Sequence, residues 1–505
     1  MVHLFKPTSY SFGAALAVGA TLAWKLVSFA NALLIALYFG AGKTTDVYFY
    51  LIMIMGFGLT FLQRMNAAVI IPEAMAQDTQ TPNGGRALLN VFLYFYILLA
   101  VLLTAAGFCC PVALGKLLSR FDLAQLTAER GLISLGFLLF GLQLLVAYLT
   151  AVLEMYRRFT AALFTPLNAL LPLVCLLCWG RTCGVVSMIY GFLAANAVQA
   201  AVFLCALKKE LNWSFTVWGT SGWHKKLTAN LVSNQAIELA NIISSVLPLY
   251  LLSGLSAGMV SALNYARQLA DSPTEIFTLR VTNVSKIQLT DSAAKSDWSQ
   301  LNRDFLTTQH FVLFLLTPLA VFTCFYAPEI ISLFFERGNF TPQDAHSAAN
   351  FLRPLMAMMW FMGPILMQNN VVAAGRKVKE SLPYALTGII LFIVLVPVTM
   401  QIFGAYAYPY TQAGCCTASL FINYLLFKKH FPQVEYVYSL RVAARLTAVN
   451  ILALFPSALY AFFGPRTHAF FTLLFGGLIF LGALWFLVRK SGDWDIFTRQ
   501  FKNRF

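Results

Sequence analysis

Residues 87–109, with the sequence ALLNVFLYFYILLAVLLTAAGFC, carry no charged side chain and are long enough to cross a lipid bilayer as a helix. A bilayer core about 30 Å thick needs roughly 20 mostly apolar residues in a helix, but only about ten in a β-strand. Inside lipid, every backbone polar group must find its partner within the protein, and a helix achieves this by itself. This stretch therefore predicts a membrane-spanning helix.

Working outward from this stretch, we mark fourteen apolar segments of similar length along the 505 residues. They begin near Phe12, Asp46, Ala87, Gly131, Ala161, Gly184, Ala229, Met259, Phe305, Ala348, Leu382, Ala405, Val442 and Ala469. The sequence thus predicts an all-α polytopic membrane protein with 14 transmembrane helices.

The composition agrees with this prediction and excludes several classes of function. Hydrophobic residues make up 59% of the chain and charged residues 11%, less than half the charged fraction of ordinary soluble domains. The longest polar interval, about Gln288 to Asp304, is too short for a soluble domain, so we expect no attached catalytic or nucleic-acid-binding module. The net charge of +15 is therefore interpreted through membrane topology.

Lysine and arginine are distributed unevenly between the two sets of loops. The loops on the N-terminal side hold 23 of the 35 Lys and Arg residues, and those on the opposite side hold seven. Because positively charged loops stay in the cytoplasm, this asymmetry predicts that both termini are cytoplasmic.

A weak internal repeat divides the chain. Residues 38–49, YFGAGKTTDVYF, recur loosely in residues 250–265, YLLSGLSAGMVSALNY, at an offset of 216 positions. The repeat predicts two pseudo-symmetric six-helix lobes plus two C-terminal helices: residues 1–215 (spans 1–6), 216–435 (spans 7–12), and 436–505 (spans 13–14 with a cytoplasmic tail). Transporters built from repeats bind their ligand between them near the bilayer midplane.

Five cations lie in or at the edges of the predicted spans: Lys25, Arg64, Arg267, Arg353 and Arg445. Each costs about 2.5–3.5 kcal/mol at a helix centre on insertion scales, so such a residue suggests a functional site. The first three lie on spans 1, 2 and 8, which the repeat makes equivalent or adjacent. The last two lie near span ends, where they can extend toward the interface, and we assign them no role.

Polar side chains at helical spacing accompany these cations. They are Thr21 and Ser28 in span 1, Gly56 and Thr60 in span 2, Asn230, Asn234, Glu238, Asn241 and Ser245 in span 7, and Asn264, Gln268, Asp271, Glu275 and Thr278 in span 8. These stripes predict one water-filled cavity between the lobes, although hydrogen bonding between helices is an alternative explanation. The acids Glu238, Asp271 and Glu275 can pair with Arg267 or bind a coupling cation.

Three motifs carry a resemblance to a known family. Residues 39–49, FGAGKTTDVYF, are similar to F-G-A-G-x-x-x-D-A-F-F, residues 265–273, YARQLADSP, to Y-A-D-R-L-x-E-F-P, and residues 333–341, LFFERGNFT, to L-x-x-R-G-x-F-T. With these motifs the chain resembles the MurJ/MviN family, the lipid II flippases of the multidrug/oligosaccharidyl-lipid/polysaccharide exporter superfamily.

The resemblance places some family residues and changes others. Lys25 stands at a family arginine of span 1, and Asp46 at the family's acid. Asn31, Leu59 and Gln268 stand where the family has arginines, which implies a reshaped anion site. By the same resemblance, spans 13 and 14 form a hydrophobic groove for the substrate's lipid tail.

The expected function is a flippase in the bacterial cytoplasmic (inner) membrane that moves undecaprenyl-pyrophosphate-linked peptidoglycan precursor (lipid II) to the outer leaflet by alternating access. The expected site is Lys25, Arg64 and Arg267 around the pyrophosphate, together with Asn31, Asp46, Gln268, Asn234, Glu238, Asp271 and Glu275. We expect a monomer that contacts membrane lipids, binds no nucleic acid, metal or cofactor, and uses a coupling cation or the membrane potential.

Three alternatives remain open at this point. A flippase for another polyprenyl-linked polysaccharide would share these features. A multidrug cation antiporter would need an acid-rich cavity, whereas the cavity residues here are mainly basic. A membrane glycosyl- or acyltransferase would need a positioned set of acid, base or metal groups, and the six histidines are scattered singly.

Overall fold

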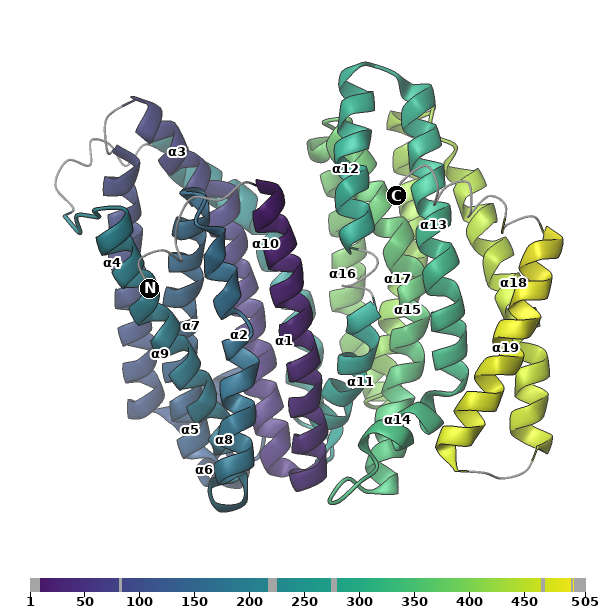
Figure 1. Cartoon of the computed structure of the whole chain (residues 1–505), viewed down its shortest axis with the longest axis horizontal. Coiled ribbons are helices and arrows are strands. Elements are labelled where there is room, and N and C mark those ends of the chain that lie inside the picture. Colours follow the sequence, from purple (N-terminus) through teal and green to yellow (C-terminus); the bar gives the residue numbers. More distant parts are fainter. Residues whose placement is uncertain are drawn as a thin grey trace. The chain divides into compact units, whose positions relative to one another are not determined.

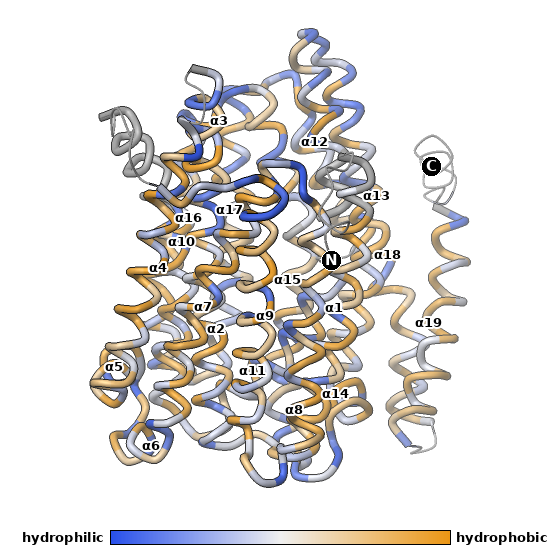
Figure 2. The backbone as a smooth tube through the Cα atoms, turned by 60° about the vertical axis from the view of Figure 1, so that its left-hand side comes forward, coloured by the Kyte–Doolittle hydropathy of each residue, from blue (hydrophilic) through white to orange (hydrophobic). Residues whose placement is uncertain are grey.

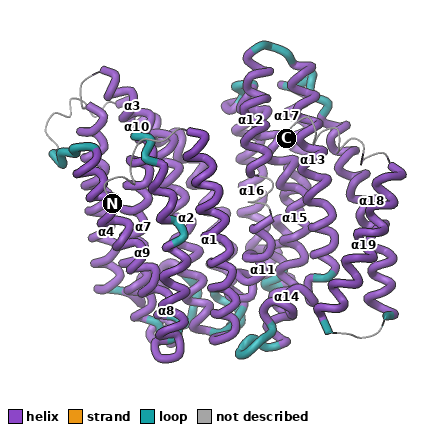
Figure 3. The backbone as a smooth tube through the Cα atoms, in the orientation of Figure 1, coloured by secondary structure: helices purple, strands orange, loops and turns teal. Residues whose placement is uncertain are grey.

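The computed structural model describes residues 10–80, 84–216, 225–273, 279–464, 468–491 and 494, and its regular elements in these ranges are all helical (Figures 1 and 3). Hydrophobic residues run along the helices, while hydrophilic residues gather toward helix ends such as those of α3 and α12 (Figure 2). This is the pattern expected where helix ends meet water and helix centres meet lipid. The predicted all-α class is confirmed.

The first compact unit comprises Met1–Ser261 together with Gly338–Phe340. Its elements are α1 (Tyr10–Phe39), α2 (Lys43–Met65), the π-helix η1 (Asn66–Ile70), α3 (Ile71–Gln80), α4 (Gly84–Cys109), α5 (Pro111–Leu118), α6 (Leu123–Ala128), α7 (Arg130–Met155), the 3-10 helix η2 (Phe159–Phe164), α8 (Leu167–Cys183), α9 (Val186–Glu210) and α10 (Lys225–Leu252).

The second compact unit comprises Ala262–Arg337 and Thr341–Phe505. Its elements are α11 (Met259–Pro273), which begins in the first unit, α12 (Leu279–Ala294), α13 (Trp298–Phe325), α14 (Ala327–Phe335), α15 (Pro342–Ala374), α16 (Val378–Phe403), α17 (Ala407–His430), α18 (Tyr436–Phe463) and α19 (Ala469–Ser491). The predicted lobe boundary at residues 215 and 216 differs from this grouping, because α10 packs against α2 and η1.

Ten helical stretches among the described residues are long and apolar enough to cross a membrane. They coincide with ten of the predicted spans, including α4, whose sequence opened the analysis. The other four predicted spans fall on α10, α11, α15 and α17, which are helical but carry more polar residues.

Close approach of small residues holds the first unit's helices together. A Cβ added to Gly141 on α7 would lie 2.9 Å from the backbone of Ala100 on α4, so only glycine allows this contact. Nearby, the Tyr96 and Tyr148 rings stack with centroids 4.8 Å apart, and the Tyr96 hydroxyl donates to Asn66 Oδ1 over 2.8 Å. Because lipid is as apolar as leucine, such packing and hydrogen bonding stabilise membrane helices more than burial of leucine does.

The turn after α1 is tied to residues distant in sequence. The backbone N–H of Asn339 donates to Leu37 O over 3.0 Å, and Asn339 Nδ2 donates to Tyr38 O over 2.5 Å. Gly40 has a φ of +64°, and a Cβ there would lie 2.3 Å from Asn339 O. The FGAG and ERGNF motifs of the sequence therefore meet at one end of the first unit, where glycine is required.

Gly40→Ala is expected to lower the free energy of unfolding by about 2–4 kcal/mol, because it combines left-handed backbone strain with a backbone clash. Gly404→Ala is the matched control. Gly404 also has a positive φ, +77°, but nothing lies within 4 Å of its added Cβ, so about 1 kcal/mol is expected. Thermal unfolding of the purified variants in detergent measures the difference, and equal losses would contradict the clash.

Candidate functional site

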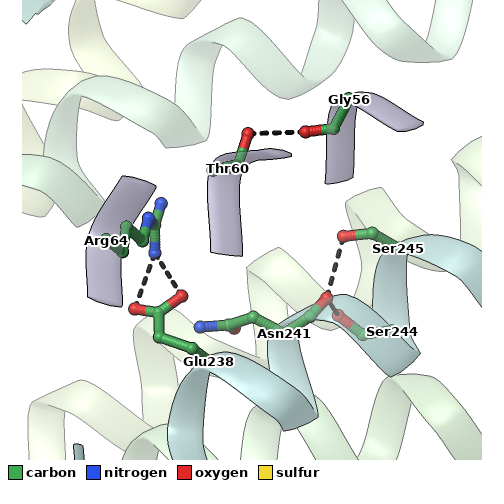
Figure 4. Close-up of polar contacts among 7 residues, drawn as sticks. All are labelled: Gly56, Thr60, Arg64, Glu238, Asn241, Ser244 and Ser245. Atoms are coloured by element: carbon green, nitrogen blue, oxygen red, sulfur yellow. Dashed lines mark hydrogen bonds and ion pairs between the residues drawn. The ribbon is translucent and has the colours of Figure 1, made fainter. Parts of the chain in front are cut away.

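Arg64 and Glu238 form an ion pair between α2 and α10. Arg64 Nη1 lies 2.7 Å from Glu238 Oε1 and 2.6 Å from Oε2, and 55% of the Arg64 side chain remains exposed (Figure 4). The sequence prediction had placed Glu238 with Arg267 or a coupling cation. The structure corrects this placement, because α10 packs against α2 and brings the carboxylate to Arg64.

The predicted polar stripe on α2 lies on one open face. Gly56, Thr60 and Arg64 are all exposed, four residues apart, and the Thr60 hydroxyl donates to Gly56 O over 2.8 Å. On α10, the hydroxyls of Ser244 and Ser245 donate to Asn241 O over 2.7 and 2.8 Å (Figure 4). Because these hydroxyls bond within their own helices, they line the face without joining the two helices.

A π-helical segment follows Arg64 directly. Residues Asn66–Ile70 form η1, and the Asn66 side chain, 1% exposed, accepts the Tyr96 hydroxyl. Single π-helical turns inside α-helices occur frequently at functional sites. The sequence analysis missed this segment, because hydrophobic periodicity does not distinguish five residues of π-helix from α-helix.

The two site residues predicted on α1 have different surroundings. Lys25 is half-buried, with Nζ 5.3 Å from the centroid of the Trp24 ring. Asn31 is buried, and its Nδ2 donates to Ala169 O on α8 over 2.9 Å. The donor group of Asn31 is therefore engaged in packing α1 against α8, and its predicted contact with substrate is not supported by this geometry.

Asp46, at the first turn of α2, is 2% exposed and caps the N-terminus of α11. Its Oδ2 accepts the N–H of Gly258 over 2.6 Å, and its Oδ1 accepts the N–H and the hydroxyl of Ser261 over 2.8 and 2.6 Å. The hydroxyls of Thr45 and Ser261, 216 positions apart as in the sequence repeat, are themselves hydrogen-bonded over 3.0 Å. Asp46 thus holds two helix starts together, a structural contact where substrate binding was predicted.

Arg267 lies on α11 and contacts α17. Its Nη2 donates to the hydroxyl of Tyr408, and its guanidinium carbon is 5.8 Å from the centroid of that ring. Asp271, one turn further along α11, attracts Arg267 electrostatically, as the spacing predicts. The Gln268 carbonyl accepts the Ser272 hydroxyl over 2.8 Å, and the Gln268 side chain is half-buried.

Part of the predicted site lies outside the described residues. These are Glu275 and Thr278 and, at the side-chain level, Asn230 and Asn234. Among the residues that are described, no three His, Cys, Asp or Glu side chains come together to hold a metal ion. The described site is thus a set of cations on α1, α2 and α11, one of them held by an exchangeable carboxylate.

An all-helical bundle with many apolar helices and intramembrane cations defines a class, the multi-pass membrane transporters. The family model described as lipid II flippase MurJ matches residues 35–480 of this sequence, and the chain belongs to this family. Its membrane location follows from this membership together with its apolar helices.

Relatives and solved structures agree. The chain is 23% identical over 403 residues to a probable lipid II flippase MurJ of Bdellovibrio bacteriovorus, covering 75% of this chain and 74% of the relative. It is 25% identical over 345 residues to another from Rhizobium meliloti, covering 65% and 63%. A solved lipid II flippase MurJ in an inward closed conformation has the same fold, with a TM-score of 0.77, 18% identity and coverage of 94% and 99%.

The fold is also shared with transporters of different cargo. An inward-facing multidrug resistance MATE family transporter of the MOP superfamily matches with a TM-score of 0.60 at 11% identity, covering 84% of this chain and 96% of that one. The same backbone therefore serves different substrates, and the cargo is determined by the side chains.

Proposed function

We propose that this protein translocates lipid II from the inner to the outer leaflet of the cytoplasmic membrane by alternating access. The observation that carries the proposal is the family match, which extends over residues 35–480 and thus over nearly all of the predicted spans. We further propose fourteen spans, with α10, α11, α15 and α17 completing the ten apolar stretches, and cytoplasmic termini.

The physical difficulty of the reaction lies in the pyrophosphate. A bare charge inside a bilayer is costly, so a carrier needs fixed cations in a hydrated path to replace the water that the headgroup loses. Lys25, Arg64 and Arg267 supply these cations in our proposal. The planar guanidinium groups bind phosphate oxygens in a bidentate manner, whereas the Lys25 ammonium acts as a point charge.

The Arg64–Glu238 pair gives this proposal a specific first step. In the resting protein Glu238 neutralises Arg64, and the substrate pyrophosphate displaces the carboxylate when it enters. More than half of the Arg64 side chain is exposed, so the guanidinium is open to an incoming anion. Exposed ion pairs contribute only about 0–1 kcal/mol, which makes this exchange easy.

The protein acts without chemical change of its cargo in this proposal, as a monomer that contacts only its lipid-linked substrate and membrane lipids. The energy source is either a coupling cation or the membrane potential. The main alternative cargo is another polyprenyl-linked polysaccharide, and the experiment below distinguishes the two because it scores lipid II itself.

Expression of the chain in bacteria depleted of their own lipid II flippase is expected to restore lipid II in the outer leaflet, recovered chemically intact. Lys25→Ala and Arg267→Ala are each expected to reduce this exposure at least tenfold at unchanged membrane abundance. Lys116→Ala, an exposed lysine of the short helix α5, is the control and retains activity. Full activity in both cavity variants would contradict the assigned roles, and failure of the wild type would contradict the cargo.

A further inference from the structure

The second unit contains two adjoining cavities. The larger, about 770 Å³, lies between α13, α15 and α18, and the smaller, about 470 Å³, is lined by α14, α15, α18 and α19. Both are lined by Pro328, Glu329 and Ala461, so they meet at the start of α14. No residue of α19 is among the described residues that line the larger cavity, which distinguishes it from the groove predicted between spans 13 and 14.

The larger cavity has apolar walls and one cation. Val321, Phe325, Ile451 and Leu454 line it together with Arg353, which the sequence analysis left without a role. Hydrocarbon chains suit such walls, because they are as apolar as lipid. A guanidinium in these surroundings calls for an anionic partner, since an isolated charge away from water is strongly unfavourable.

Acidic groups lie where the two cavities meet and beyond. Glu329 lines both cavities, and Glu336 lines the smaller one, where it accepts the Ser332 hydroxyl. Within the described part of the chain, neither Arg353 nor Glu329 forms an ion pair. Along the cavities, the order is therefore apolar wall, then arginine, then carboxylates.

Three polar atoms of the larger cavity's lining residues are buried without a hydrogen-bond partner among the described residues. They are Thr317 Oγ1, Glu329 Oε2 and Trp360 Nε1. Thr317 is 1% exposed, so its hydroxyl is cut off from water. Buried polar groups are normally satisfied, and three such atoms around one cavity indicate a polar ligand group there.

We propose that these cavities bind an amine-bearing phospholipid, such as phosphatidylethanolamine. Its acyl chains occupy the apolar walls, its phosphate pairs with Arg353 and accepts from Trp360 and Thr317, and its ammonium group pairs with Glu329. The headgroup thus carries its two charges in the same order as the protein's own charges. An anionic lipid without an amine, such as phosphatidylglycerol, leaves Glu329 beside a phosphate and binds more weakly.

The experiment measures lipid retention on purified full-length protein by native mass spectrometry after titration with phosphatidylethanolamine or phosphatidylglycerol in detergent micelles. Wild type is expected to prefer phosphatidylethanolamine about tenfold. Arg353→Gln is expected to weaken binding of both lipids about tenfold. Glu329→Gln is expected to remove the preference while leaving phosphatidylglycerol binding intact or stronger. Arg130→Gln, an exposed arginine of α7, is the control with unchanged binding.

Trp360→Phe keeps the ring but removes the N–H donor, so it tests the phosphate contact without removing a charge, and a severalfold loss is expected. Two results would overturn the proposal. One is an unchanged lipid preference in Glu329→Gln that elutes as a monodisperse protein. The other is stoichiometric displacement of the phospholipid by a polyprenyl-pyrophosphate, which would assign the cavities to the transported substrate.

Discussion

Asp46→Ala is expected to lower the free energy of unfolding by about 3–5 kcal/mol. The carboxylate accepts three hydrogen bonds while 2% exposed, two of them from the backbone N–H groups at the start of α11. Helix N-termini leave such N–H groups unsatisfied and attract negative charge, so Asp46 caps α11 from another helix. Removing it strands two buried donors and a hydroxyl, each costing about 1–3 kcal/mol before relaxation.

The measurement is the midpoint of thermal unfolding in detergent, supported by sensitivity to protease. Asp46→Asn is expected to show roughly half the loss, because an amide keeps one acceptor oxygen but lacks the charge. Asp122→Asn is the matched control, since Asp122 precedes α6 but its side chain forms no cap hydrogen bond. A melting temperature for Asp46→Ala equal to that of the control would contradict the capping role.

Arg64→Ala is expected to reduce transport at least tenfold with little change in stability. The Arg64 side chain is 55% exposed, so its ion pair with Glu238 contributes at most about 1 kcal/mol to folding. Transport instead loses a planar group that binds the pyrophosphate. Arg64→Lys is expected to retain part of the activity, because it keeps the charge and loses the bidentate geometry.

A double variant separates this role from a structural one. If the pair only joined α2 to α10, Arg64→Ala would be harmful through the unpaired carboxylate, and Arg64→Ala/Glu238→Ala would recover transport. We expect no recovery, whereas Glu238→Gln alone is expected to remain active because Arg64 stays available. The assay is outer-leaflet exposure of lipid II at matched protein abundance, and recovery in the double variant would refute the substrate role of Arg64.

The helices were predictable from the sequence where composition alone decides them. Residues 87–109 lack charge altogether, and they lie within α4 (Gly84–Cys109). The open stripe of Gly56, Thr60 and Arg64 was predictable as well, because residues four apart share a helix face. On α10 and α11 polar side chains dilute the apolar signal, so length and periodicity indicate a helix there with less contrast.

The partners of the site residues were not predictable in the same way. Arg64 and Glu238 are 174 residues apart, and Asp46 and Ser261 are 215 apart, so their contacts depend on how the helices pack. Asn31 illustrates the same limit. Its place in span 1 suggested the cavity, whereas the packing of α8 against α1 turned its amide to a backbone carbonyl. Periodicity assigns a residue to a face of its helix and gives no information about the neighbour.

The central claim is that fixed cations pass a lipid-linked pyrophosphate through the protein. It is tested most directly by reconstituting purified protein in liposomes with labelled lipid II in one leaflet and measuring its arrival in the other. Wild type is expected to translocate the lipid chemically unchanged, and the triple variant Lys25→Ala/Arg64→Ala/Arg267→Ala is expected to fall to the rate of protein-free liposomes. Equal rates for wild type and triple variant would contradict the account.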